Sequence, residues 1–261
     1  MSASAIVFLM YHELELTGRK LCQSEPGYVR YILPVEGFRS QMSWLKREGW
    51  RGLNVSEALR YPAEPSVCIT FDDGCETDLL AAAPVLREFG FNATFYATAG
   101  FLGTPGYLDA RQVRDLDTHG FQIGCHSMTH PYLSDLTEAE LRREIVDAKL
   151  QIEAIVEHPI EHFSCPGGRY DARALQMARE AGFKTVANSQ FRANSPDTDL
   201  YELGRVAMLR DLTIEEFSNT CRGHGLWKKR MQHQTRHGVQ RLLGNTAYDR
   251  LRSFLLGEPR K

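Results

Sequence analysis

The chain has 261 residues, of which 43% are hydrophobic and 25% are charged, a composition typical of globular proteins. Its formal net charge of -2 excludes a strongly basic protein, so nothing global points to nucleic acid as a partner. The length suits one large α/β domain or two small ones, and neither an internal repeat nor a long Pro/Gly/Ser linker divides the sequence.

The first apolar run, residues 5–10, lacks a basic flank and is too short for a signal segment or a membrane span. We therefore expect a cytoplasmic protein. The six cysteines include no CxxC pair, and a chain of this size does not need disulfides to hold its core. We expect them to be reduced thiols.

Apolar runs of strand length alternate with amphipathic segments, which is the pattern of βα units around a parallel sheet or barrel. The expected strands are residues 5–10, 67–71, 93–96, 121–124, 162–164, 185–187 and 203–207. The expected helices are residues 38–45, 79–89 before Gly90, 141–156 behind a Thr137–Glu140 capping box, and 172–181 before Gly182. The pattern predicts a single-domain, distorted (β/α)7-type barrel over residues 1–221.

Two adjacent carboxylates, Asp72 and Asp73, follow directly on the apolar run 67–71 and precede Gly74. Adjacent carboxylates repel each other, so the pair is costly unless a cation lies nearby or one of them takes up a proton. Asp and Gly are also common in solvated turns. Taken alone, the segment is equally compatible with such a turn.

Two histidines, His126 and His130, follow the expected strand 121–124. Their spacing suits two ligands of one metal ion, and a single carboxylate would complete a two-His-one-carboxylate set with open positions. An isolated HxxxH is weak support because surface histidines are common. In a barrel, however, the loops after the strands meet on one face, which would bring both motifs together with Tyr11-His12 and residues 166–168.

From residue 66 to about residue 205 the sequence resembles the polysaccharide deacetylases, also called NodB-homology or family-four carbohydrate esterases. TFDDG at 70–74 is similar to the first motif of the family, HSMTH at 126–130 to the second, and FSCPGG at 163–168 to a diverged third. Residues 199–206 resemble, more loosely, members associated with exopolysaccharide assembly. The resemblance implies metal-dependent removal of N-acetyl groups from an amino sugar in polysaccharide or glycoconjugate biosynthesis, with release of acetate.

The resemblance also implies a role for each matching position. Asp73, His126 and His130 would hold one divalent metal ion, and Asp72 would be the general base toward the attacking water. We expect zinc from the ligand types, while nickel, cobalt or iron would fit the same set. The implied substrate is an N-acetylated sugar.

The third motif departs from the family pattern. Family members carry an arginine there that orients the base, and an aromatic residue after the proline, whereas this chain has Ser164 and Gly167 at these positions. The role of the arginine is thus unassigned. The main-chain N–H of Gly167 can still act as an oxyanion donor, because that role needs no side chain.

The general acid is a second departure. The family's usual late Leu-His motif is not found in a strand context after Val206, and His224 lies in a polar, Gly-flanked stretch. His12, directly after the first strand, resembles the circularly permuted branch in which this motif comes first. We predict that His12 protonates the leaving amine; the alternative is a hydrogen-bonded histidine at a strand end.

Cys75, Cys125 and Cys165 each neighbour a motif, and thiolate is a good zinc ligand. Because three ligands are already assigned, we interpret these cysteines as small fillers of strand ends.

Residues 222–261 differ in charge from the rest, with ten Lys/Arg and two Asp/Glu, and we expect a basic helical C-terminal extension. We expect its basic face to be solvated. The alternative is peripheral attraction to an anionic lipid headgroup or a phosphate-bearing sugar carrier.

Two other functions stay open. One is a different amide hydrolase on the same scaffold, since fold does not fix the substrate. The other is a catalytically inactive sugar-binding or assembly protein, which the missing third-motif arginine keeps open. The sequence leaves the sugar and its lipid, nucleotide or polymer carrier unidentified, although a cytoplasmic location favours a precursor over a finished extracellular polymer.

Overall fold

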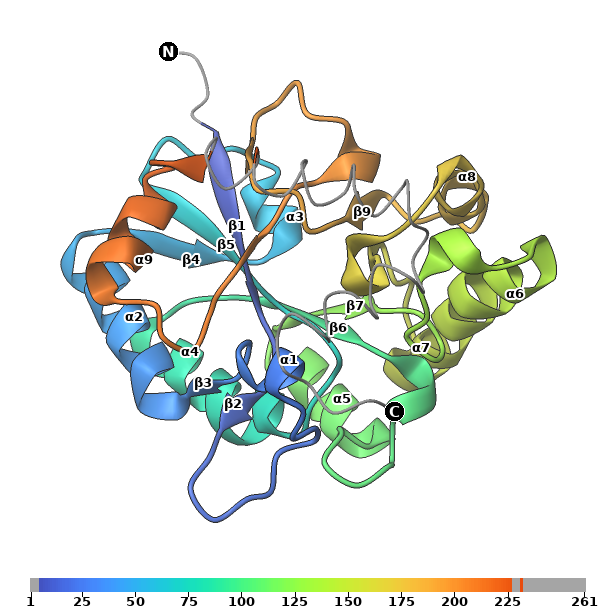
Figure 1. Cartoon of the computed structure of the whole chain (residues 1–261), viewed down its shortest axis with the longest axis horizontal. Helices are drawn as coiled ribbons and strands as arrows, with labels where there is room; N and C mark the ends of the chain where they lie inside the picture. The colour runs from blue at the N-terminus through green and yellow to red at the C-terminus, as the bar shows by residue number, and fades with distance from the viewer. Residues whose placement is uncertain (1–4, 227–230, 232–261) are drawn as a thin grey trace.

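The computed structural model describes residues 5–226 and residue 231 (Figure 1). A mostly parallel sheet forms its centre, in the order β10-β1-β5-β6-β7-β8-β9, with β4 beside β5 and β11 beside β1. The strands are β1 (Ile6–Tyr11), β4 (Arg51–Leu53), β5 (Ser66–Phe71), β6 (Thr94–Ala97), β7 (Gln122–Cys125), β8 (His162–Ser164), β9 (Thr185–Ala187), β10 (Ala193–Asn194) and β11 (Val206–Ala207). The expected (β/α)7-type barrel is confirmed as a sheet curled into a half-barrel.

One segment connects the two ends of this sheet. Leu203 forms a parallel bridge with Ala187 at the end of β9, and Val206 pairs with Leu9 of β1. The expected strand 203–207 is therefore split between a single bridge and the two residues of β11. Not every strand is followed by a helix as expected, because β9 leads into β10, which runs antiparallel to β1.

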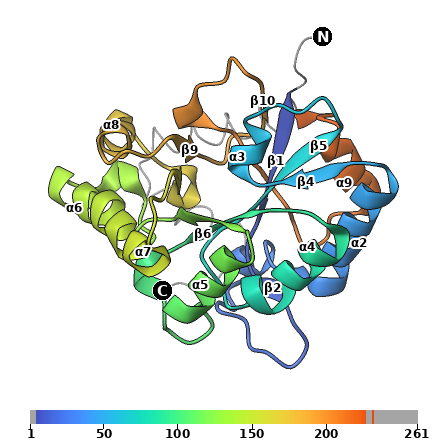
Figure 2. The same ribbon diagram turned by 180° about the vertical axis from the view of Figure 1, so that it is seen from behind.

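Helices surround the sheet in both views (Figures 1 and 2). They are α1 (Pro26–Val29), α2 (Val35–Arg47), α3 (Val55–Ala58), α4 (Ala83–Phe89), α5 (Ala110–Thr118), α6 (Glu138–Arg142), α7 (Ala148–Val156), α8 (Ala172–Glu180) and α9 (Ile214–Cys221). A small separate ribbon pairs β2 (Leu14–Glu15) with β3 (Leu33–Pro34).

The helix ends follow the expected sequence signals. Thr137 and Glu140 form the predicted capping box at the start of α6, so this helix begins before the expected residue 141. A π-helical segment (Arg143–Asp147) joins α6 to α7. Gly90 ends α4 with a left-handed φ of 70°, a conformation that glycine adopts without steric cost.

Alternation along the strands sends side chains to the two sides of the sheet. In β5, Val67, Ile69 and Phe71 belong to the large core cluster, whereas Cys68 belongs to the smaller cluster with Phe8 and Tyr96. Thr70 and Asp72 are two and four residues after Cys68, so their positions lie on the same side of the sheet as Cys68. The strand pattern therefore directs the first carboxylate away from the large core.

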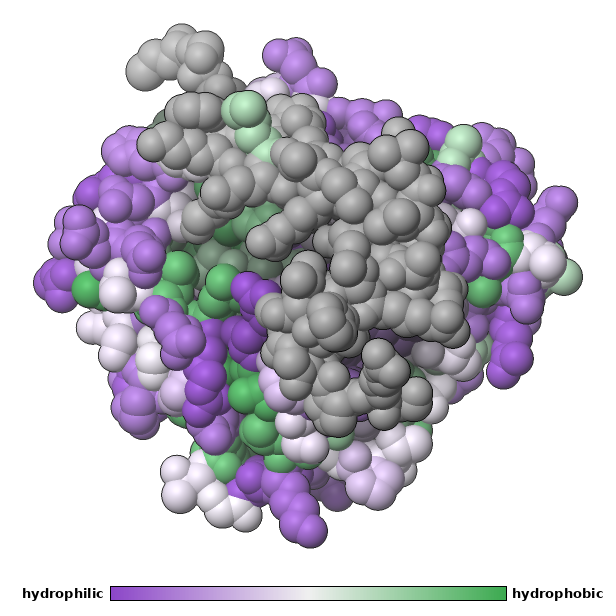
Figure 3. All heavy atoms as spheres, in the orientation of Figure 1, coloured by the Kyte–Doolittle hydropathy of each residue, from purple (hydrophilic) through white to green (hydrophobic). Residues whose placement is uncertain are grey.

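On the face drawn in Figure 3, the described atoms at the rim are mainly hydrophilic. Within the described part of the chain, no helix combines the length and the apolar character needed to cross a bilayer. The predicted extension 222–261 lies almost wholly outside the described residues and stays a prediction, together with its boundary.

Candidate active site

The two adjacent carboxylates end β5 in a turn with unusual backbone geometry. Asp72 and Asp73 are only 2% and 3% exposed. Asp73 has a φ of 78° and Gly74 a φ of 76°, so two consecutive residues adopt the left-handed conformation. This conformation is disfavoured for an aspartate, and such strained residues cluster at functional sites. A side chain at residue 74 would also approach the Cα of Ala97 to 3.1 Å, which favours glycine there.

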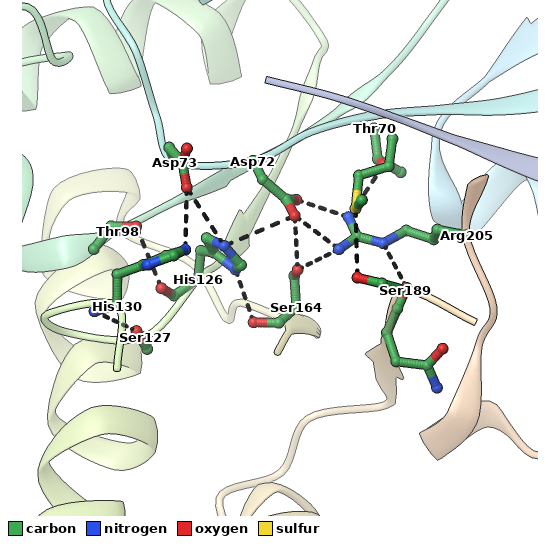
Figure 4. Close-up of polar contacts among 12 residues, drawn as sticks. Thr70, Asp72, Asp73, Thr98, His126, Ser127, His130, Ser164, Ser189 and Arg205 are labelled. Atoms are coloured by element: carbon green, nitrogen blue, oxygen red, sulfur yellow. Dashed lines mark hydrogen bonds and ion pairs between the residues drawn. The ribbon is translucent and has the colours of Figure 1, made fainter. Parts of the chain in front are cut away.

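The structure brings the three predicted metal ligands together (Figure 4). Asp73 Oδ1 lies 3.5 Å from Nε2 of His126 and 3.4 Å from Nε2 of His130. Asp73 Oδ1 is buried and has no hydrogen-bond partner among the described residues. A buried, unpaired carboxylate oxygen facing two imidazole nitrogens fits a shared divalent cation, because the ion satisfies all three donor atoms at once.

His126 is held in the tautomer that a metal ligand requires. Its Nδ1 lies 2.9 Å from the carbonyl oxygen of Ser164, which can only accept, so Nδ1 donates and the lone pair of Nε2 faces Asp73. Burial lowers the pKa of His126 to about 4 despite the nearby Asp72 carboxylate. The imidazole is therefore neutral at physiological pH.

The loop that carries His130 is fixed by a carboxylate that the sequence analysis did not identify. Glu144 Oε2 accepts from the backbone N–H groups of Met128 (2.9 Å) and Thr129 (2.7 Å), and Oε1 accepts from the Thr129 hydroxyl (2.6 Å). Ser127 and His130 both have positive φ values, 67° and 62°. Glu144 thus stabilises a strained turn that presents His130 to Asp73.

Arg205 contacts the proposed base from the segment that closes the sheet. Its Nη1 donates to Asp72 Oδ1 and its Nη2 to Asp72 Oδ2, both at 2.7 Å. Nη2 also donates to the Ser164 hydroxyl at 2.7 Å, and Nη1 to the Thr70 hydroxyl at 3.2 Å. The guanidinium is fully buried. Figure 4 shows the forked guanidinium of Arg205 in contact with the side chains of Asp72 and Ser164.

The ion pair sets the charge of Asp72. Burial by itself would raise the pKa of this carboxyl, but Arg205 and His126 outweigh burial and hold the pKa well below its usual range. The orienting arginine is not assigned by the sequence, and the structure places Arg205 against the same carboxylate. One sequence feature could have indicated Arg205: it is the charged residue within the expected strand 203–207, whose other residues are apolar.

His12 lies beside the carboxylates. Its ring packs against Tyr31, with centroids 5.3 Å apart, and its Nδ1 is buried with no hydrogen-bond partner in the described chain. Burial lowers the pKa of His12, while the charges of Asp73 and Asp72 act in the opposite direction. Tyr28, on α1, donates its hydroxyl to Asp73 Oδ2 at 2.8 Å. The role of His12 as the acid stays a prediction.

The two remaining candidates differ in their surroundings. Gly167 has a φ of 58°, and a side chain there would approach the Tyr132 ring to 2.8 Å. Within residues 5–226, no other group accepts a hydrogen bond from its N–H. His224 lies in an exposed turn after α9. The oxyanion role of Gly167 stays a prediction.

Comparison with known proteins identifies the family. Residues 60–186 match the family described as polysaccharide deacetylase. The chain belongs to this family. One relative is YxkH of Bacillus subtilis, a protein named as a polysaccharide deacetylase. It is 29% identical to this chain, and the match covers 76% of this chain and 69% of YxkH.

A second relative is the peptidoglycan-N-acetylglucosamine deacetylase of Bacillus cereus, which is 33% identical over 47% of this chain. The match spans only 56% of that enzyme. The fold agrees with a solved structure, the Streptococcus pyogenes deacetylase PplD in complex with acetate, at a TM-score of 0.74 and 23% identity. That alignment covers 84% of this chain and 99% of PplD.

The residues of the site fall on both sides of the boundary of the family match. Asp72, Asp73, His126 and His130 lie inside residues 60–186. Arg205 lies outside, as does His12 near the start of the chain. The match to the family therefore covers the candidate metal centre. Arg205 lies beyond the match and contacts Asp72 because residues 203–206 pair with both β9 and β1.

Proposed function

We propose that this protein hydrolyses the N-acetyl group of an N-acetylated amino sugar, releasing acetate and a free amine. The observation that carries the proposal is the buried Asp73 Oδ1, unpaired within the described residues and facing Nε2 of His126 and His130. Family membership supports the same reaction class.

One divalent cation, which we propose to be zinc, would be held by Asp73, His126 and His130. When bound, it would supply Lewis-acid activation of water and of the acetyl carbonyl. Nickel, cobalt and iron are compatible with the same ligands. Neutral His126, locked by the Ser164 carbonyl, offers its lone pair without first losing a proton.

Asp72 would take the proton of the attacking water. It is ionised, buried and held in one orientation by the two N–H groups of Arg205. A fixed carboxylate loses little freedom when the reaction begins, which favours catalysis through positioning. The water oxygen then forms a bond to the acetyl carbon, and the carbonyl oxygen gains negative charge.

Breaking the C–N bond requires a proton on the leaving nitrogen, because an amide anion is too basic to be expelled. His12 would donate this proton from beside the carboxylates. The N–H of Gly167 would stabilise the oxyanion before the bond breaks. The products are acetate and the free amine; Asp72 releases its proton to solvent, and His12 regains a proton from solvent.

The presence of Arg205 bears on the alternative of an inactive sugar-binding protein. That alternative stayed open because the third motif lacks an arginine, and Arg205 supplies a guanidinium to the same carboxylate. The ion pair therefore favours an active enzyme.

An acetate-release screen with the purified chain tests the proposal. The panel contains N-acetylglucosamine oligomers, a nucleotide-linked N-acetylamino sugar and a lipid-linked one, each with zinc, cobalt, nickel or iron(II). The proposal predicts acetate from at least one member and none from the His126→Ala variant. Release of ammonia from simple carboxamides instead would indicate a different amide hydrolase.

A further inference from the structure

A second group of metal-type ligands lies next to the site, outside the roles assigned above. Glu13, Cys22 and Cys75 each offer a ligand atom, and the three atoms lie within 4.8 Å of one another. Glu13 comes just after β1, Cys22 lies in the loop between β2 and α1, and Cys75 follows the Asp72-Asp73-Gly74 turn. Three separate segments thus converge on one point.

The loop around Cys22 is closely packed there. The Cys22 N–H lies 3.1 and 3.0 Å from the two carboxylate oxygens of Glu13. The Cys22 thiol donates to the carbonyl oxygen of Gly106 at 3.1 Å. Gly106 has a φ of +92°, and a side chain at this position would come within 2.9 Å of the Cys22 sulfur. The positions of the thiol and the carboxylate are therefore fixed by backbone contacts.

Asp78 provides an independent observation. Its side chain is fully buried, and neither carboxylate oxygen has a hydrogen-bond partner among the described residues. Its backbone N–H donates to the carbonyl of Cys75 at 2.9 Å, which places it one turn beyond that cysteine. Burial raises the pKa of the Asp78 carboxyl, and the charge of Asp73 raises it further.

A buried carboxylate without a partner is costly, and a cation removes that cost. Two sulfur donors favour a thiophilic ion over magnesium or calcium, which prefer oxygen ligands. Two thiolates and the Glu13 carboxylate would supply three donors of the four-coordinate set typical of a structural zinc site.

We propose that Glu13, Cys22 and Cys75 bind a second divalent ion of the zinc class. The site is separate from the Asp73 centre and does not depend on the proposed deacetylase activity. Its role is to fasten the loop of Cys22 to the sheet. Tyr28, which donates to Asp73, comes six residues after Cys22, so the same loop leads into the aromatic residues beside His12.

Cobalt substitution tests this site selectively. The full chain is purified with its thiols reduced and loaded with Co²⁺, and the near-ultraviolet spectrum is examined for sulfur-to-cobalt charge transfer. We expect this absorption in the wild type and in His126→Ala, because the Asp73 centre contains no sulfur. Cys22→Ser and Cys75→Ser should lose it. Cys221→Ser, which replaces a buried thiol on α9, should keep it.

Zinc content provides the second readout. The wild type should hold two equivalents, and Cys22→Ser and His126→Ala should each hold about one. Cys22 lies in a half-buried loop, so Cys22→Ser retains the test if Cys75→Ser does not fold. A wild-type protein with six reduced thiols and no charge-transfer absorption would overturn the proposal. So would a native disulfide between Cys22 and Cys75.

Discussion

Arg205 and Asp72 form a two-pronged, fully buried ion pair, in which each Nη atom donates to a different carboxylate oxygen at 2.7 Å. The two residues are 133 positions apart in the sequence. The pair fixes both the charge and the orientation of the proposed base. Ser164, at the position where the family has its usual arginine, donates to Asp72 Oδ2 at 3.2 Å and accepts from Arg205.

The fork predicts the effect of replacing Arg205 by lysine. Arg205→Lys keeps a positive charge but cannot contact both carboxylate oxygens in one plane. We expect kcat to fall roughly 10²-fold through misplacement of Asp72, with KM and metal content nearly unchanged. Arg210→Lys is the matched control, because Arg210 pairs with Glu15 instead. Wild-type kcat in Arg205→Lys would show that the fork does not position the base.

The missing arginine illustrates what the sequence could not provide. Residues 203–207 stood out as a candidate strand, and an arginine inside an apolar run was an anomaly. Its partner, however, depends on how the sheet closes. Only the bridge from Leu203 to Ala187 and the pairing of Val206 with Leu9 bring Arg205 to Asp72. Such contacts between distant segments leave no local periodicity in the sequence.

The two adjacent aspartates should respond differently to the same substitution. Asp72→Asn preserves shape but cannot accept a proton, so turnover should be lost while the metal is retained. Asp73→Asn removes the charge that faces His126 and His130, so metal binding should weaken. Metal content and acetate release are measured on both variants. The opposite pattern would mean that base and ligand are exchanged.

His12 is predicted to be the general acid. His12→Ala should keep the metal and the fold but lower kcat by about 10²-fold or more, the usual size for the loss of a general acid. His224→Ala is the control, since His224 lies in an exposed turn, and it should behave as the wild type. Wild-type turnover in His12→Ala would rule out the assignment.

Strands were predictable where every residue of the strand is buried. The runs at 162–164 and 185–187 match β8 and β9 residue for residue. By contrast, β4 has the same length but begins with the exposed Arg51 followed by Gly52, so it forms no apolar run and was not predicted. Helix α5 was also missed, because only Val113 and Leu116 of its nine residues are buried. Short or mostly exposed elements depend on their neighbours for stability, so the local sequence contains little signal.

His162 predicts how stability depends on pH. It is 2% exposed, and its ring nitrogens contact the hydroxyls of Ser56 (2.8 Å) and Thr185 (2.9 Å). Burial lowers its pKa to about 4, from 6.5. As pH falls through this window, the unfolded chain takes up a proton that the folded chain does not. Stability conferred by neutral His162 is therefore full above pH 6.5 and declines by up to about 3 kcal/mol toward pH 4.

Urea unfolding of the wild type and of His162→Gln at pH 7 and pH 4.5 measures this effect. Glutamine can hydrogen-bond but does not titrate, so the variant should lose less free energy of unfolding between the two pH values. Other histidines titrate in both proteins, and their contributions cancel in the difference. Equal losses in the two proteins would contradict a neutral, buried His162.

We infer that the Asp73 centre hydrolyses N-acetyl groups. The most direct measurement follows N-acetylglucosamine oligomers carrying ¹³C-labelled acetyl groups, incubated with zinc-loaded wild type and with Asp72→Asn. We expect free labelled acetate and new amine to appear in equal amounts with the wild type, and neither to appear with Asp72→Asn. Equal acetate release by both proteins would contradict this inference. So would the absence of acetate from wild type that holds its metal and is given each sugar carrier in turn.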